Sequence, residues 1–126
     1  MVERVKIVIP HRLPSLNEVI GANRANKYAG AKLKKETQIL IEHHIKMQDI
    51  GKFEKVRIDI DWYEPNKKRD FDNISSAKKF ILDAMVKCGV IPNDGWKNLA
   101  PSFVECFHID KDKPRVEVYL TDMIGE

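Results

Sequence analysis

The chain has 126 residues, of which 43% are hydrophobic and 33% are charged, and its formal net charge is +3 at pH 7. This size suits one domain, 1–126, and the composition is too apolar for a disordered chain. The apolar runs are far shorter than the roughly 20 residues that cross a bilayer, and the first residues read as a strand instead of a signal peptide. With only Cys88 and Cys106, neither a disulfide framework nor a structural zinc site is expected. We therefore expect a cytoplasmic protein with no membrane association.

The first half of the chain predicts a strand, a long loop, a helix and a second strand. Val5, Ile7 and Ile9 alternate with charged or smaller residues, and the strand ends at Pro10. Residues 11–30 contain proline and glycines and predict an irregular, functional loop. Residues 31–49 predict a helix that ends before Gly51, with one apolar side formed by Leu33, Leu40, Ile41, His44 and Met47. Residues 56–63 alternate again, which predicts a half-buried strand.

The second half predicts a helix, a turn and two strands. Apolar positions recur at helical spacing from residue 72 to 88, and Gly89 supplies the stop. Residues 91–95 have the composition of a turn, and residues 103–109 and 115–121 read as strands. The predicted fold is α+β, with a single sheet of about four strands and two helices packed on it, in the order β-loop-α-β-α-β-β.

Three aspartates carry the most informative pattern. Asp70 and Asp72 lie where the loop after the second strand meets the second helix, and Asp94 lies on the turn after that helix. Side chains at i and i+2 of an extended chain point the same way, so two carboxylates can converge if Asp70 is extended. Close carboxylates repel unless a cation lies between them, and oxygen ligands favour Mg²⁺, or Mn²⁺ as a substitute, over zinc. Such an ion can activate water against a phosphate.

Each acid also has a purely structural interpretation. Asp72 can be the N-cap of the second helix, Asp70 can pair with Arg69, and Asp94 can be an ordinary turn residue. Lys79 lies on the same side of the predicted helix as Asp72, so it can reach the acids and neutralise a phosphate. It can equally pair with Asp83 four residues later, and the residues alone leave both interpretations open.

Basic residues gather ahead of the acids. Residues 19–35 contain no acidic side chain, a second basic cluster covers residues 67–69, and the balance turns acidic after residue 105. This asymmetry suits a polyanion bound on one face, although lysines that only solvate a loop and a helix give the same pattern. The candidate DNA contacts are Arg24, Lys27, Lys32, Lys35, Lys67, Lys68 and Arg69.

Four blocks resemble the RusA-type Holliday junction resolvases (crossover junction endodeoxyribonucleases), in particular the phage and prophage versions. These blocks are Ser15–Glu18, Asp70–Ile74, Lys79–Met85 and Gly89–Trp96. The resemblance implies a homodimeric endonuclease of DNA recombination and repair that cuts two opposed strands of a four-way junction. It also implies Mg²⁺ held by Asp70, Asp72 and Asp94, with Lys79 matching the family's catalytic lysine. In the shorter family pattern that lysine falls where Ser76 stands, so three additional residues precede Lys79.

Two other functions stay open on the sequence. One is a catalytically silent DNA-binding module of prophage origin, against which three converging carboxylates argue because they hinder phosphate binding. The other is a structure-selective nuclease acting on other branched nucleic acids, since selection by shape leaves no sequence signature. Trp96 can stack on an unpaired base or serve as a rim aromatic. No histidine has an acid or serine partner at a recognisable spacing, which disfavours a histidine mechanism.

Overall fold

The computed structural model describes residues 4–123, which form one four-stranded mixed sheet and four helices. The elements in chain order are β1 (Arg4–Ile9), α1 (Leu16–Ala25), α2 (Lys27–Met47), β2 (Val56–Glu64), α3 (Phe71–Ser75), α4 (Lys78–Lys87), β3 (Glu105–Ile109) and β4 (Arg115–Asp122). The strand order is β1-β4-β2-β3; β4 is antiparallel to both neighbours, and β2 and β3 are parallel. The predicted α+β class and the four strands are confirmed.

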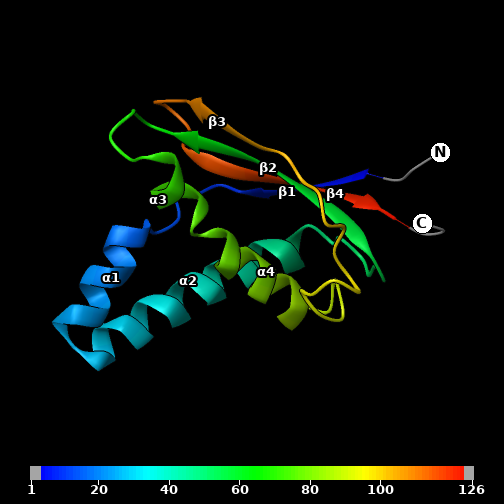
Figure 1. The fold of residues 1–126 in the computed structure, drawn as a ribbon, viewed down its shortest axis with the longest axis horizontal. Helices are drawn as coiled ribbons and strands as arrows, with labels where there is room; N and C mark the ends of the chain where they lie inside the picture. The colour runs from blue at the N-terminus through cyan, green and yellow to red at the C-terminus, as the bar shows by residue number, and fades with distance from the viewer. Residues whose placement is uncertain (1–3, 124–126) are drawn as a thin grey trace.

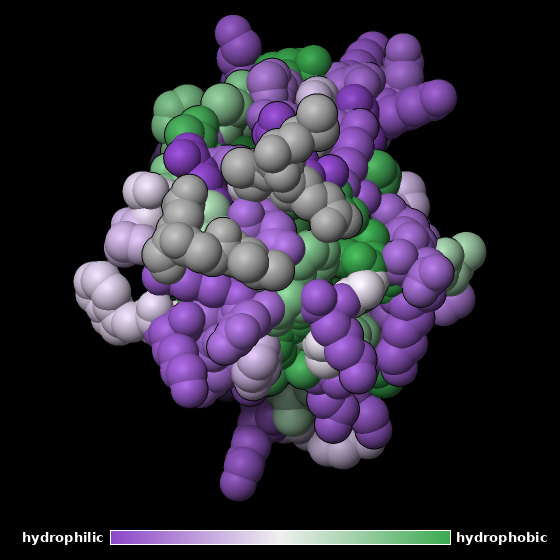
Figure 2. Space-filling model, turned by 90° about the vertical axis from the view of Figure 1, so that its right-hand side faces the viewer, coloured by the Kyte–Doolittle hydropathy of each residue, from purple (hydrophilic) through white to green (hydrophobic). Residues whose placement is uncertain are grey.

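The helices α2 and α4 lie along one face of the sheet, and α1 and α3 lie near one end of it (Figure 1). β1 begins and β4 ends at the other end, whose surface is largely hydrophilic around a narrow hydrophobic band (Figure 2). The segment that leads from β2 into α3, which carries Asp70 and Asp72, therefore lies at the opposite end of the sheet from the start of β1. Within residues 4–123, no helix has the length and apolar character of a membrane span.

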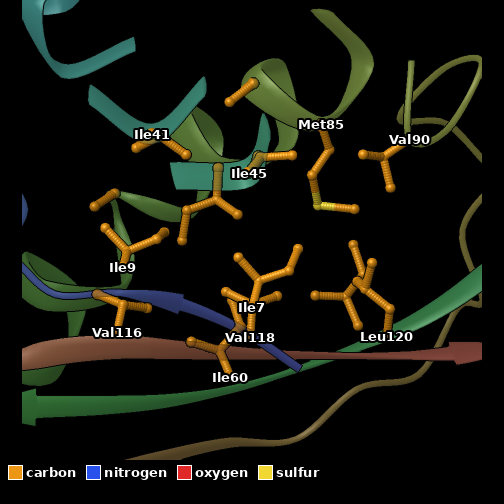
Figure 3. Packing of buried hydrophobic residues seen from close by; sticks show 14 of the residues in the cluster. Ile7, Ile9, Ile41, Ile45, Ile60, Met85, Val90, Val116, Val118 and Leu120 are labelled. Carbon is orange, nitrogen blue, oxygen red and sulfur yellow. The ribbon is translucent and has the colours of Figure 1, made fainter. Parts of the chain in front are cut away.

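The core lies between the sheet and the two long helices. Alternate side chains of the strands, among them Ile7 and Val118, face Ile45 of α2 and Met85 of α4 (Figure 3). Ile7, Val118 and Met85 are at most 1% exposed. The alternation fixes the register, because a slip of one residue would turn this apolar set to solvent. Burial of such side chains is the main favourable contribution to folding.

The predicted loop over residues 11–30 is wrong, because it contains α1 and the start of α2. Ser15 and Glu18 form a capping box: the Ser15 hydroxyl accepts from the Glu18 amide at 3.2 Å, and the Glu18 carboxylate accepts from the Ser15 amide at 3.4 Å. Gly30 lies within α2 where Asn23 of α1 approaches closely. A β-carbon at Gly30 would lie 1.9 Å from Oδ1 of Asn23, so a larger residue would require the Asn23 side chain to move.

The boundaries of α2 also differ from the prediction. The helix begins at Lys27 instead of residue 31, with the Asn26 side chain accepting from the Ala29 amide at 2.7 Å. Its last residue, Met47, is 67% exposed and does not belong to the buried side. The apolar side is completed instead by Ile45, which is 3% exposed.

The single helix predicted over residues 72–88 is divided into α3 and α4 by a turn at Ser76 and Ala77. The Ser76 hydroxyl donates to the carbonyl of Asn73 at 3.0 Å, which competes with a continuous helix. Ala77 is 1% exposed and anchors the turn in the core. The predicted stop is confirmed, since Gly89 has a φ of 75° and follows α4.

Candidate active site

The loop that carries the first two acids leaves β2 at Glu64. Pro65 follows and lacks an amide hydrogen, and the Asn66 side chain then accepts from the Lys68 amide at 3.0 Å. Asp70 is extended, with φ −72° and ψ 160°, and is the N-cap residue of α3. Asp72 lies in the first turn of that helix. The extended conformation of Asp70 is the one in which its carboxylate and that of Asp72 can point the same way. The N-cap residue is Asp70, and the interpretation of Asp72 as the N-cap is wrong.

A cleft of about 730 Å³ opens beside this loop. Asp70 and Asp72 line it together with Lys67, and its apolar part includes Phe71 and Phe107, whose ring centroids are 4.4 Å apart. The Asp70 side chain makes no capping hydrogen bond, and Oδ1 of Asp72 accepts only from the adjacent backbone amide, at 3.0 Å. Both carboxylates therefore keep acceptor capacity at the cleft.

Asp94 lies on a turn that is anchored at both ends. After Gly89, Val90 and Ile91 are buried in the core. At the other end the buried Asn98 donates to the carbonyl of Glu54 at 2.7 Å, and its own carbonyl accepts from Val56. These contacts fix the position of the acidic turn relative to the sheet, so Asp94 occupies a defined place.

Lys79 connects this turn to α4. Its ammonium lies 3.0 Å from Oδ1 of Asp83 and 3.4 Å from Oδ2 of Asp94. Hydrogen bonding and charge attraction from Asp83, and then from Asp94, raise the pKa of Lys79 above its ordinary value. The ammonium therefore stays protonated at neutral pH. The pairing of Lys79 with Asp83 is observed and the ammonium also reaches Asp94, whereas its action on a phosphate stays a prediction.

The structure brings Asp70 and Asp72 to one cleft but places Asp94 at a separate, smaller hollow beside the exposed Trp96. Among residues 4–123, no group of three or more His, Cys, Asp or Glu side chains is close enough to hold a metal ion in this conformation. The donor chemistry of Asp70 and Asp72 nevertheless fits a hard divalent cation, since both offer carboxylate oxygens. The structure thus separates a carboxylate pair, Asp70 and Asp72, from a lysine and aspartate pair, Lys79 and Asp94.

The basic residues of the sequence prediction fall into two regions. Arg24 ends α1, and Lys27, Lys32 and Lys35 lie on α2, all exposed. Lys67 and Lys68 are exposed on the loop that precedes the acids. Arg69 differs: its side chain is 17% exposed and pairs with Glu18 and Glu64. The suggested pairing of Arg69 with Asp70 is therefore replaced by pairing with two other acids.

Sequence reasoning missed one pair of side chains at the rim of the cleft. His108 of β3 lies 3.0 Å from Oδ1 of Asp61 on β2, and it stacks on Tyr63 with 4.6 Å between ring centroids. His108 and Asp61 are 47 residues apart in the sequence, so no recognisable spacing links this histidine to its acid partner. The alternation of each strand could have placed Asp61, Tyr63 and His108 on the sheet face away from the helices. That they are neighbours follows from the parallel register of β2 and β3, which the sequence does not reveal.

Comparison with known proteins agrees with these features. Residues 2–121, nearly the whole chain, match the family model described as endodeoxyribonuclease RusA. No curated protein matches the chain. The blocks on which the sequence resemblance rests contribute the capping box of α1, the acid pair, the start of α4 and the acidic turn. The chain therefore belongs to the RusA endodeoxyribonuclease family.

Proposed function

We propose that this protein is a Mg²⁺-dependent endodeoxyribonuclease that binds four-way DNA junctions and resolves them by paired, symmetric cuts. The observation that carries the proposal is the pair of carboxylates of Asp70 and Asp72 on one cleft of a RusA-family chain. Two carboxylates that line one cleft offer hard oxygen ligands to a divalent cation, and a surface that collects phosphates supplies the setting in which the cation is useful.

The residues proposed to hold the ion are Asp70, Asp72 and Asp94. When bound, the ion lowers the pKa of a water molecule and stabilises charge on the scissile phosphate. Because the Asp94 carboxylate is held by Lys79, its participation requires the turn to move or a water molecule to bridge the distance. The extended Asp70 and the helical Asp72 orient their carboxylates from a loop that is tied down on both sides.

Lys79 is proposed to stabilise negative charge on the reacting phosphate. Its ammonium is protonated, is 70% exposed at the side chain, and is aimed by Asp83 and Asp94. A preoriented cation next to developing charge lowers the barrier without reorganisation during the reaction.

The DNA backbone is proposed to contact the exposed basic residues Arg24, Lys27, Lys32, Lys35, Lys67 and Lys68. Such contacts give affinity that is sensitive to salt and largely independent of sequence, so selection of the junction comes from its shape. We further propose a two-fold homodimer, since two symmetric sites match two opposed strands. A prophage origin would agree with the versions of the family that the sequence resembles.

The test is cleavage of labelled four-way junction and duplex DNA by the wild-type protein, Asp70→Asn and the control Asp112→Asn. Asp112 lies in the exposed turn between β3 and β4 and does not line the cleft. We expect paired nicks in the junction with Mg²⁺, none with EDTA, and loss of cutting but not of binding in Asp70→Asn. Asp112→Asn should behave as the wild type.

Four results would contradict the proposal in distinct ways. Cutting that survives EDTA removes the metal mechanism. Junction binding without cutting by the wild-type protein favours a silent DNA-binding module. Equal cutting of flaps, forks or RNA favours a nuclease of broader structural preference, and sedimentation of the unbound protein as a monomer removes the dimer.

A further inference from the structure

We propose that Arg69 is a positioning residue that fixes the Asp70–Asp72 loop against α1, and that it does not bind a DNA phosphate. This inference deepens the proposed function, on which it rests. It assigns a role to Glu18 and Glu64 as well, which hold the arginine.

Arg69 directly precedes Asp70 and is attached at several points. One guanidinium nitrogen donates to the carbonyl of Leu13 at 2.9 Å and lies 3.9 Å from Oε1 of Glu64. The other nitrogen donates to Oε1 of Glu18. Only 17% of the Arg69 side chain is exposed, whereas the neighbouring Lys68 is exposed. The planar guanidinium thus spans two carboxylates and a carbonyl, a geometry that lysine cannot reproduce.

The two acids that hold Arg69 are themselves fixed. Glu64 is 5% exposed at the end of β2, and Arg12 donates to its Oε1 at 2.7 and 3.0 Å. Glu18 is part of the capping box with Ser15, so its carboxylate is fixed at the start of α1. Arg69 therefore connects one end of the sheet to the beginning of the first helix.

The other side of the acid pair is tied to the same helix. Oδ1 of Asn73, one residue after Asp72, accepts from the backbone amide of Asn17 at 3.3 Å. The residues just before and just after the acid pair thus both contact residues 13–18, and α1 and α3 lie close together near that end of the sheet (Figure 1). The position of the two carboxylates is set from the N-terminal segment.

To bind a DNA phosphate, the Arg69 guanidinium would have to leave Glu18, Glu64 and the carbonyl of Leu13. That exchange would leave the buried Glu64 with Arg12 alone and release Glu18, so it removes compensation from a carboxylate that is nearly inaccessible to water. Lys67 and Lys68 reach solvent without such a loss. Of the three basic residues in this loop, Lys67 and Lys68 are therefore free to contact DNA, whereas Arg69 is largely buried and paired with carboxylates.

The experiment compares Arg69→Lys, Arg69→Gln and Glu18→Gln with the matched control Glu36→Gln, which removes a helix carboxylate 3.9 Å from Lys32 on α2. Lys68→Ala gives the reference behaviour of a phosphate contact. The readouts are Mn²⁺ affinity of the DNA-free protein, junction Kd in EDTA at several salt concentrations, and the single-turnover cleavage rate in Mg²⁺. Amide hydrogen exchange over residues 70–74 is a fourth readout that needs neither metal nor activity.

We expect Arg69→Lys and Glu18→Gln to lower Mn²⁺ affinity and cleavage about 10- to 100-fold, the range found when a group that orients metal ligands is removed. Exchange over residues 70–74 should become faster, while junction Kd and its salt slope stay close to wild type. Lys68→Ala should weaken junction binding and lower the salt slope by about one. Glu36→Gln should leave Mn²⁺ affinity and exchange unchanged.

The inference is overturned if Arg69→Lys retains wild-type Mn²⁺ affinity and exchange while Arg69→Gln weakens junction binding and flattens the salt slope, since charge alone would then matter. Should Arg69→Lys unfold, Glu18→Gln decides, because Glu18 is about half exposed and its glutamine still offers an acceptor. A wild-type protein that neither binds Mn²⁺ nor cuts would refute the proposed function instead. In that case unchanged exchange in both variants would refute positioning, and faster exchange would support it.

Discussion

The ammonium of Lys79 lies 3.4 Å from Oδ2 of Asp94, which joins the first turn of α4 to an acidic turn fifteen residues later in the chain. The same ammonium lies 3.0 Å from Asp83, so it is held between two carboxylates. This pairing keeps a protonated amine at the side of the site where Asp94 is located.

Replacement of Lys79 by alanine should reduce junction cleavage strongly and junction binding weakly. We expect a loss of about 10²–10³ in the cleavage rate, the range for removal of one group that stabilises transition-state charge. Lys79→Arg should retain part of the rate because the charge persists. Single-turnover kinetics with saturating protein measure this, with Lys87→Ala on the same helix as the control, and equal losses in the two alanine variants would contradict the assignment.

The exposed lysines of the acid-bearing loop should account for a defined part of the salt dependence. Lys67→Ala and Lys68→Ala should each weaken binding similarly for junctions of different sequence and lower the slope of log K against log salt by about one. Lys111→Ala, in the turn between β3 and β4, is the matched control. Fluorescence anisotropy at several salt concentrations tests this, and a slope unchanged in all three variants would exclude these lysines as phosphate contacts.

Glu117 should make stability depend on pH in the acid range. Burial opposes its ionisation, but hydrogen bonds from Lys6, Arg115 and Tyr119 outweigh burial and lower the pKa of Glu117 from 4.5 to about 2. Because the folded-state pKa is the lower one, this stabilisation is present above about pH 4.5 and is lost as the pH falls toward 2.

The corresponding variant is Glu117→Gln. At pH 7 it should lower the free energy of unfolding by about 1–3 kcal/mol, and the difference from wild type should shrink as the pH approaches 2. Urea unfolding at a series of pH values measures it, with the exposed Glu36→Gln as control. A difference that does not change between pH 7 and pH 2 would show that the charge of Glu117 is not the cause.

The two glycines of the α1–α2 region should respond oppositely to alanine. A β-carbon at Gly21 meets nothing within 4 Å, so Gly21→Ala should stabilise by about 0.5–1 kcal/mol. A β-carbon at Gly30 would collide with the Asn23 side chain and lie 3.2 Å from its Cα, so Gly30→Ala should destabilise by about 1–3 kcal/mol. Thermal unfolding measures both, and adding Asn23→Ala to Gly30→Ala should restore part of the loss.

The strands could be predicted from the sequence because their alternation is a local property of neighbouring residues. Val5, Ile7 and Ile9 predict β1, and the apolar positions of β2 are buried as expected. The helix α1 was missed because Gly21 and Gly30 suggested a loop, although Ser15 and Glu18 carried the capping signal. At Gly30 the helix contains glycine where Asn23 of α1 approaches closely. That approach depends on the tertiary structure and has no local signal in the sequence.

The candidate site was only partly accessible to sequence reasoning. The extended conformation of Asp70 and its shared cleft with Asp72 agree with the i and i+2 argument. The contact of Lys79 with Asp94 depends on where α4 begins. The angle between Asp72 and Lys79 was predicted for one continuous helix, and it does not apply because the helix is broken at Ser76. The approach of Glu18 to Arg69 spans 51 residues, so no local pattern contains it.

The position of β4 within the sheet has a consequence for biosynthesis. Among the strands of residues 4–123 it is the last along the chain, yet it lies between β1 and β2 and pairs with both. A nascent chain that has not yet released residues 115–122 from the ribosome cannot close the sheet, so β1 and β2 are not joined within the sheet until those residues emerge. Premature termination before residue 115 would therefore remove the strand that pairs with both β1 and β2, and β1 would lose its partner in the sheet.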